Sequence, residues 1–197
     1  MSATLKQGML SIMPYYIIYS RIAEYQKVMS HIRKHLRNEH VKLEFAVMKK
    51  EMINIHKGSR TTKVYNALPG YLFLRTDEPL DSKTVHEILE TWEVYYFLHY
   101  ADGTLELQRN DEKFASQVFE LPKVITADNV FIRNGDTVEI VNGAFSTLTG
   151  KILKIDRRRC RVDVLLKFME RDLKLSLPFS SVAVRDQEDS EDDKKEK

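Results

Sequence analysis

The sequence predicts an α+β domain followed by a small β-barrel, and three observations support this prediction. Between residues 15 and 121, short apolar and β-branched runs typical of strands alternate with segments whose apolar residues recur at helical spacing. Residues 121–134 have no clear period and contain a proline near their start. After them come only short apolar runs separated by turn residues, which indicates a β-barrel.

The N-terminal elements are expected in the order strand, helix, strand, strand, helix, strand, helix. Ser82 is the expected N-cap of the second helix, and Asn110 or Asp111 that of the third. Gly58 lies in a turn-like segment, 55–63, which separates the two middle strands. The expected strands are 15–20, 42–54, 64–76 and 94–100, and the expected helices are 21–38, 82–92 and 110–121. This order predicts an α/β sandwich, with helices packed on one antiparallel sheet.

Four strands are expected in the barrel, and their β-branched, alternating composition favours strands over a helical hairpin. They are 136–141, 151–156, 160–168 and 173–179. The predicted domains are therefore 1–120, a linker at 121–134, a barrel at 135–185 and a disordered, charged tail at 186–197. Alternation within the third barrel strand places Cys160, Val162, Val164 and Leu166 inside, and Arg159, Arg161, Asp163 and Lys167 outside.

The composition excludes several classes of function. One cysteine in 197 residues rules out a disulfide within the chain and suggests a reducing compartment. No apolar stretch reaches the length of a transmembrane helix, so a cytoplasmic protein without membrane contact is expected. His31 and His35 have metal-binding spacing, but no third ligand lies near them. No catalytic motif is present, so we expect a binding protein, not an enzyme, with no cofactor and no metal.

The basic residues are unevenly distributed. The net charge is only +2, yet residues 130–185 hold eleven Lys or Arg against six Asp or Glu. Within this segment, "DRRRCR" places four arginines in five residues, although turns favour Gly, Asn or Asp. A nucleic-acid backbone would convert the repulsion among these cations into a favourable interaction. The candidate RNA-binding residues are Lys151, Lys154, Arg157, Arg158, Arg159, Arg161, Lys167, Arg171 and Lys174. The alternatives are a protein partner or a solvated face.

Several motifs resemble the NusG family of transcription factors in their order and spacing. They are "YYIIYS", "NALPGYLFLRT", "GDTVEIVNGAFSTLTGKILKID" and "LSLPFSSVAV". The N-terminal half resembles the NGN domain of that family. The C-terminal part resembles its KOW domain, with Gly143, Phe145 and Gly150 at the expected places. The resemblance covers about residues 13–184, and the arginine-rich ending is most similar to the LoaP group of bacterial antitermination paralogues.

This resemblance implies a bacterial transcription elongation and antitermination factor that suppresses pausing and termination and acts as a monomer. Its NGN domain would bind the clamp helices of RNA polymerase through an apolar patch formed by Tyr15, Leu68, Pro69 and Tyr71. The break at Pro69 in an expected strand can turn Leu68 and Tyr71 out of the sheet. The alternative is that Leu68 and Tyr71 belong to the core. The loop 56–62 is left open between a contact to DNA of the transcription bubble, a contact to polymerase, and a plain surface hairpin.

For the KOW domain, similarity to LoaP implies binding of an RNA hairpin in the nascent leader. The alternative is a general NusG-like factor whose KOW domain recruits Rho or a ribosomal protein through Phe145 and Phe168. The sequence from Phe168 to Arg171 lacks the glycine common in the family, which would alter that loop.

Overall fold

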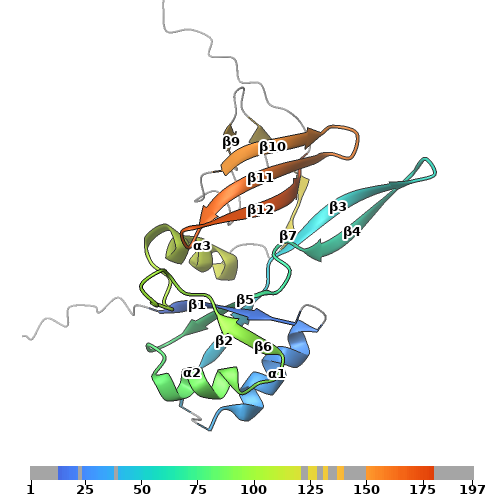
Figure 1. Ribbon diagram of the computed structural model, residues 1–197. Helices are drawn as coiled ribbons and strands as arrows, with labels where there is room; N and C mark the ends of the chain where they lie inside the picture. The colour runs from blue at the N-terminus through green and yellow to red at the C-terminus, as the bar shows by residue number, and fades with distance from the viewer. Residues whose placement is uncertain are drawn as a thin grey trace, which may run out of the picture. The chain divides into compact units, whose positions relative to one another are not determined.

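The computed structural model describes residues 13–21, 24–37, 40–120, 124–127, 131–132, 137–139 and 150–179 (Figure 1). The chain forms two compact units. The first comprises residues 1–48 and 68–123, and the second comprises residues 49–67 and 124–197. A segment from the N-terminal half, 49–67, therefore belongs to the same unit as the C-terminal strands.

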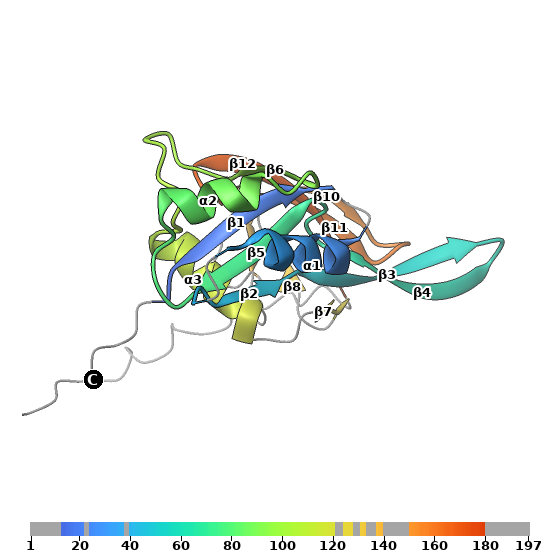
Figure 2. The ribbon, with the colours of Figure 1, turned by 90° about the horizontal axis from the view of Figure 1, so that it is seen from below.

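The first unit is built on a four-stranded antiparallel sheet in the order β2-β5-β1-β6. Its strands are β1 (Tyr15–Ser20), β2 (Leu43–Ala46), β5 (Tyr71–Thr76) and β6 (Val94–Phe97), and its helices are α1 (Tyr25–His35), α2 (Ser82–Leu89) and α3 (Arg109–Glu120). Helices α1 and α2 cover one face of the sheet and α3 lies against the other, as Figures 1 and 2 show. The predicted α+β sandwich is confirmed.

Alternation along the strands divides the core of this unit between the two faces. Tyr16, Ile18, Leu72 and Leu74 pack with the apolar faces of α1 and α2. Between them in the sequence, Ile17 and Phe73 point the other way, where Phe73 meets Phe114 of α3 with 5.7 Å between ring centroids. Burying each such side chain contributes about 1.5–3 kcal/mol, so both faces of the sheet are stabilised by packed helices.

The second unit contains two sheets. One has the order β12-β11-β10-β9-β8, and the other has the order β4-β3-β7, in which β3 and β4 form a hairpin. The strands are β3 (Lys49–His56), β4 (Ser59–Asn66), β7 (Val124–Ile125), β8 (Phe131–Ile132), β9 (Thr137–Glu139), β10 (Gly150–Asp156), β11 (Arg161–Phe168) and β12 (Arg171–Pro178). Buried Val162, Val164, Leu166, Leu175 and Leu177 alternate along β11 and β12. The expected strand-rich C-terminal region is confirmed.

Two of the expected N-terminal strands are each divided in two. Residues 42–54 form β2 and part of β3, and residues 64–76 form part of β4 and all of β5. The second break has a clear cause, because Pro69 has no N–H group for a ladder hydrogen bond and Gly70 has a φ of +89°. The expected loop 55–63 is mostly paired, because β3 and β4 are in register from Lys49–Asn66 to His56–Ser59.

The helix starts differ from the prediction by one to four residues, and the largest difference is in α1, which begins at Tyr25 instead of residue 21. Asp81, not Ser82, is the N-cap of α2, since its Oδ1 accepts a hydrogen bond from the backbone N–H of Thr84 at 2.7 Å. Hydrogen bonds from Thr84 also lower the pKa of the Asp81 carboxyl. Helix α3 begins at Arg109, so Asn110 and Asp111 lie inside its first turn, where a carboxylate is favoured by the helix dipole.

The predicted inward direction of Cys160 is wrong, whereas Val162, Val164 and Leu166 are fully buried as predicted. Cys160 lies in the turn before β11, with a φ of +50°, and its Sγ is 3.8 Å from the carbonyl oxygen of Arg157. The strand alternation begins only after this left-handed residue. The predicted tail, 186–197, lies outside the described residues.

A strained two-residue turn joins β11 and β12. Met169 and Glu170 lie between the paired residues Phe168 and Arg171, and their φ angles are +47° and +60°. Two central residues with positive φ are typical of a type I′ turn, which favours glycine or asparagine. Neither position is a glycine or asparagine, so the turn holds a conformation that costs L-residues about 1–2 kcal/mol each.

We predict that Glu170→Gly raises the free energy of unfolding by about 0.5–1 kcal/mol, because glycine relieves the strain but loses more chain entropy on folding. Urea titration monitored by circular dichroism measures the change. Glu170→Ala is the matched control, since it removes the same carboxylate and keeps the Cβ. Equal stabilisation by Ala and Gly would show that the charge, and not the backbone, is responsible.

Candidate functional site

The structure places only half of the predicted polymerase patch at the surface. Tyr15 is 6% exposed and packs on Phe119 of α3, with 5.8 Å between ring centroids. Leu68 is 2% exposed. Pro69 is exposed and Tyr71 is half-buried. The prediction that Tyr15 and Leu68 are surface contacts is therefore wrong. Strand alternation points Tyr15 toward α3, and Leu68 belongs to the core.

Four tyrosines from three strands form a cluster that the sequence did not predict. The ring of Tyr19 lies 5.6 Å from that of Tyr71, 6.1 Å from Tyr95 and 5.2 Å from Tyr96, measured between centroids. Tyr95 and Tyr96 remain 55% and 45% exposed. We call Tyr19, Tyr71, Tyr95 and Tyr96 the tyrosine cluster. Exposed aromatic rings that already pack on one another bury large apolar area on binding at little entropic cost, as in many protein interfaces.

Gly70 fixes the geometry of this cluster. Its carbonyl oxygen accepts the N–H of Ser20 at 2.8 Å, and its own N–H donates to the Tyr25 hydroxyl at 2.7 Å. A Cβ at this position would lie 2.4 Å from Cε2 of Tyr19. Burial raises the pKa of Tyr25, so this hydroxyl stays protonated at neutral pH. Only glycine allows Tyr19 to lie against the turn that precedes Tyr71.

An exposed tryptophan is also part of this unit. Trp92 is largely exposed, and the guanidinium of Arg21 lies 4.9 Å from the centre of its ring. The adjacent tyrosines in β6 and this tryptophan are the sequence features from which an aromatic surface could have been predicted. Their partner Tyr19 could not be identified from the sequence, because the strand pairing brings it there.

The arginine run forms the turn between β10 and β11. Arg157, Arg158 and Arg159 are all exposed, and we call them the arginine turn. Asp156 shapes it: its Oδ1 accepts the backbone N–H of Arg159 at 3.0 Å, and its Oδ2 lies 4.0 Å from Nε of Arg159. Within the described part of the chain, Arg157 and Arg158 make no ion pair. The turn therefore presents cationic side chains that the fold leaves available.

Arg161 has a different role. Its Nη2 donates to the carbonyl oxygen of Ile53 at 3.1 Å and to Oδ1 of Asn54 at 3.0 Å, both on β3. Beside it, Nζ of Lys50 donates to the carbonyl oxygen of Ser176 at 2.7 Å. Burial, and then the charge of Arg161, lower the pKa of Lys50. The structure therefore uses Arg161 to join β3 to the C-terminal sheet.

The other predicted RNA-binding residues occupy several places on this sheet. Lys151 and Lys174 both pair with Leu165, and Lys154 lies opposite Asp163, so these three lysines share the outer face. Lys167 forms an ion pair with Asp172, with 2.5 Å between Nζ and Oδ1. Arg171 lies at the far end of β11 from the arginine turn, about 25 Å along an eight-residue strand. Arg171 is therefore not part of the surface formed by the arginine turn.

The two predicted KOW partner residues do not form an exposed patch among the described residues. Phe168 is buried, and the neighbouring Met169 is 1% exposed. Phe145 lies outside the described residues.

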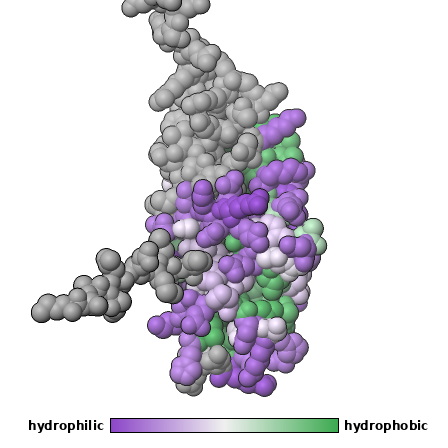
Figure 3. All heavy atoms as spheres, turned by 90° about the vertical axis from the view of Figure 1, so that its left-hand side faces the viewer, coloured by the Kyte–Doolittle hydropathy of each residue, from purple (hydrophilic) through white to green (hydrophobic). Residues whose placement is uncertain are grey.

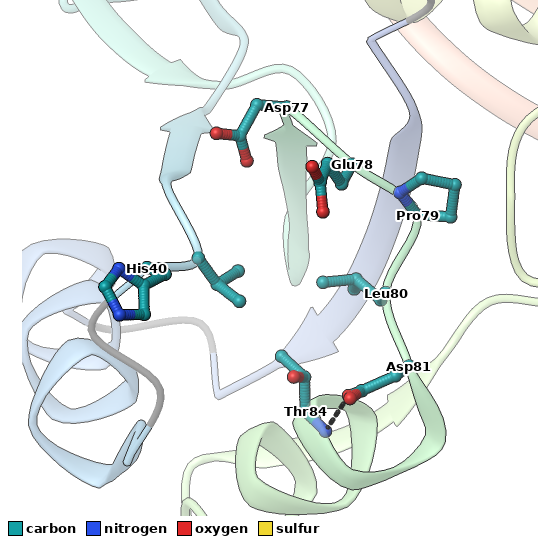
Figure 4. Close-up of a pocket in the computed structure, with 8 residues that line it drawn as sticks. His40, Asp77, Glu78, Pro79, Leu80, Asp81 and Thr84 are labelled. Atoms are coloured by element: carbon teal, nitrogen blue, oxygen red, sulfur yellow. Dashed lines mark hydrogen bonds between the residues drawn. The ribbon is translucent and has the colours of Figure 1, made fainter.

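The described residues show a pocket in the first unit, with a volume of about 200 Å³ (Figure 4). It is lined by His40, Val41, Asp77, Glu78, Pro79, Leu80, Asp81 and Thr84. Asp81 is already engaged as the cap of α2, and no group of three metal-ligating side chains occurs in the described ranges.

His31 and His35, which have metal-binding spacing in the sequence, make other contacts in the structure. Nδ1 of His31 lies 2.5 Å from Oε1 of Glu93, and Nδ1 of His35 bonds the carbonyl oxygen of His31.

On the side shown in Figure 3, hydrophilic residues cover most of the coloured surface, and apolar residues appear in smaller areas between them. Among the described residues, no helix is long and apolar enough to cross a membrane.

We predict that Arg161→Ala loosens the hairpin from the sheet, because it removes the donor to two acceptors on β3. Each hydrogen bond lost from this charged donor should lower the free energy of unfolding by no more than about 1.5–3 kcal/mol. Faster hydrogen exchange of the β3 amides, measured by mass spectrometry, would report this. Arg158→Ala removes the same charge from the arginine turn and serves as control. Identical exchange in the two variants would contradict the structural role of Arg161.

Comparison with known proteins agrees with this architecture. Residues 13–114 match the family model described as transcription termination factor NusG, and residues 134–166 match the KOW motif. The transcription termination/antitermination protein NusG of Thermus thermophilus is 23% identical over 181 residues, covering 85% of this chain and 96% of that protein. The NusG of Deinococcus radiodurans is 27% identical over 150 residues, covering 68% and 76%.

Among solved structures, NusG of Thermotoga maritima, described for its domain interaction, has a TM-score of 0.53 at 18% identity, covering 84% of this chain and 93% of that one. This similarity concerns the fold. Because the family model matches more than half of the chain, the protein belongs to the NusG family of transcription termination and antitermination factors.

Proposed function

We propose that this protein is a transcription elongation and antitermination factor that binds RNA polymerase through its first unit and RNA through the arginine turn. The two activities would use different physical interactions. The tyrosine cluster offers apolar area with hydroxyl groups at its edge, and the arginine turn offers positive charge. The protein would suppress pausing and termination by being held on polymerase and on the transcript at the same time.

The tyrosine cluster is the observation that supports the polymerase half of the proposal. Pro69 and Tyr71 were expected at this surface from family resemblance, and Tyr19, Tyr95 and Tyr96 extend it. The rings surround a turn that Gly70 holds rigidly. A preformed aromatic surface of this kind suits the clamp helices of polymerase, because helical partners present apolar side chains at regular spacing.

Three exposed arginines in one turn support the RNA half. Asp156 satisfies the backbone of the turn, so the fold itself does not require arginine side chains at Arg157 and Arg158. Arginine binds phosphate in a bidentate manner and stacks on bases, which makes it suitable for a structured RNA such as a leader hairpin. This half of the proposal corresponds to a LoaP-like role.

The alternative is a general NusG-like factor whose KOW domain recruits Rho or a ribosomal protein. The buried Phe168 and Met169 leave no aromatic side chain exposed at that turn, so the described residues favour RNA.

For the polymerase surface, we predict that Tyr95→Ala with Tyr96→Ala weakens binding to RNA polymerase by about 30-fold or more, since even one central aromatic residue often contributes about 2 kcal/mol. Biolayer interferometry with the purified polymerase of the source organism would measure this. Tyr65→Ala, which removes an exposed tyrosine of the second unit, is the control. If the control weakens binding as much as the double variant, the tyrosine cluster is not the polymerase surface.

For the arginine turn, we predict that replacing Arg157, Arg158 and Arg159 with alanine lowers RNA affinity at least tenfold. The slope of log K against log salt concentration should decrease by about 2–3, or about 0.9 per lost phosphate contact. Fluorescence anisotropy of the full chain with a labelled RNA stem-loop measures both quantities. Arg161 is retained because it holds β3.

A control variant replaces Lys27, Lys34 and Lys83, three exposed lysines of the first unit, with alanine. RNA affinity that responds equally to both triple variants would reflect net charge alone and would refute the RNA-binding role. Binding of Rho or a ribosomal protein without RNA binding would establish the alternative.

A further inference from the structure

The β3–β4 hairpin and the arginine turn are neighbours in the second unit, although about 100 residues separate them in the sequence. Arg161, two residues after the arginine turn, donates hydrogen bonds to Ile53 and Asn54 in the outer half of β3. In both Figure 1 and Figure 2, the hairpin and the β10–β11 turn project on the same side. The hairpin therefore has the position to contact a ligand held by the arginine turn.

The strand register shows which face of the hairpin is turned toward the C-terminal sheet. Lys50, Met52 and Asn54 alternate along one face of β3. Lys50 bonds Ser176 of β12, Met52 is buried, and Asn54 accepts from Arg161. Their partners on β4 are Tyr65, Lys63 and Thr61, respectively, so these three residues share the same face. The opposite face carries Lys49 and Arg60.

Lys63 and Tyr65 are both exposed on this sheet-facing side. Tyr65 is 43% exposed, and its hydroxyl accepts a hydrogen bond from Nδ2 of Asn54 at 2.9 Å. Asn54 thus connects Tyr65 to Arg161 through two direct contacts. The side chain of Tyr65 is held by its tip while its ring remains accessible, an arrangement suited to stacking on an unpaired base.

The charges on this part of the unit are poorly balanced. Residues 49–66 contain five Lys or Arg and a single acid, Glu51, which the register places on the opposite face of the hairpin. Asp156 is engaged in shaping the arginine turn, and Asp163 is the remaining acid beside Lys50 and Arg161. Burial and, to a smaller extent, the charge of Arg161 lower the pKa of Lys50, while Asp163 acts in the opposite direction. Phosphates of a nucleic acid would relieve the repulsion, and their binding to these cations would release counterions condensed on the nucleic acid.

We propose that the sheet-facing side of the β3–β4 hairpin and the arginine turn form one RNA-binding surface, in which Lys63 contacts a phosphate and Tyr65 stacks on an unpaired base. This inference rests on the proposed RNA-binding function and assigns part of it to the N-terminal half of the chain. Arg161 and Asn54 position the two parts of the surface relative to one another.

The test uses the full chain and a fluorescein-labelled RNA stem-loop with a 12-base-pair stem and an unpaired loop, at several salt concentrations. Lys63→Ala should lower affinity about fivefold and reduce the salt slope by about 0.7–0.9, the value for one phosphate contact. Lys49→Ala removes the same charge from the opposite face and should leave the slope unchanged. Tyr65→Ala should lower affinity about fivefold or more with the slope unchanged, whereas Tyr65→Phe keeps the ring and should bind normally.

The outcomes separate this inference from the proposed function. The extended surface is refuted, and the RNA-binding function stands, if the arginine-turn variant loses RNA affinity but the hairpin variants do not differ from their controls. In that case Lys63→Ala binds RNA like Lys49→Ala, and Tyr65→Ala binds RNA like Tyr65→Phe. If the arginine-turn variant binds RNA normally, the proposed function fails and this inference with it. Loss on both the turn and Lys63, with Lys49→Ala unaffected, supports the extended surface.

Discussion

The turn at Gly70 is the constraint on which the first unit depends. At this point the chain re-enters the first unit after Ala67, and its return requires a left-handed residue without a Cβ, because the ring of Tyr19 occupies the space where a Cβ would be. Hydrogen bonds from Ser20 and to Tyr25 fix the turn at both of its backbone polar groups. The turn stands between buried Leu68 and half-buried Tyr71, at the end of the β1–β5 pairing where Tyr19 lies opposite Tyr71.

In the second unit, a comparable role is played by two cationic side chains that bond to backbone. Arg161 and Lys50 each reach across from one strand to neutral oxygen acceptors on another, and these acceptors offset part of the desolvation cost of burying the two cations. The proposed RNA ligand, bound close to this junction, would add to the stability of this unit.

The two proposed surfaces differ in how they respond to solution conditions. In the proposal, the tyrosine cluster would bind through apolar area, so its affinity should depend little on salt. The arginine turn would bind through charge, so its affinity should fall steeply as salt rises. The two proposed partners, a folded protein and a polyanion, would therefore be recognised by different physical interactions.

The sequence by itself determined the fold class, the order of most elements, the burial of Val162, Val164 and Leu166, and the family, because hydrophobic periodicity and short turn motifs are local properties. It also located the arginine turn.

Only the tertiary structure decided which candidate residues are available for binding. Tyr15 and Leu68 are buried, Arg161 bonds β3, and Arg171 lies at the far end of β11. Tyr19 joins Tyr95 and Tyr96 through the pairing of β1 with β6, two segments far apart in the sequence. Such contacts depend on register and packing over long sequence separations, which local patterns do not encode.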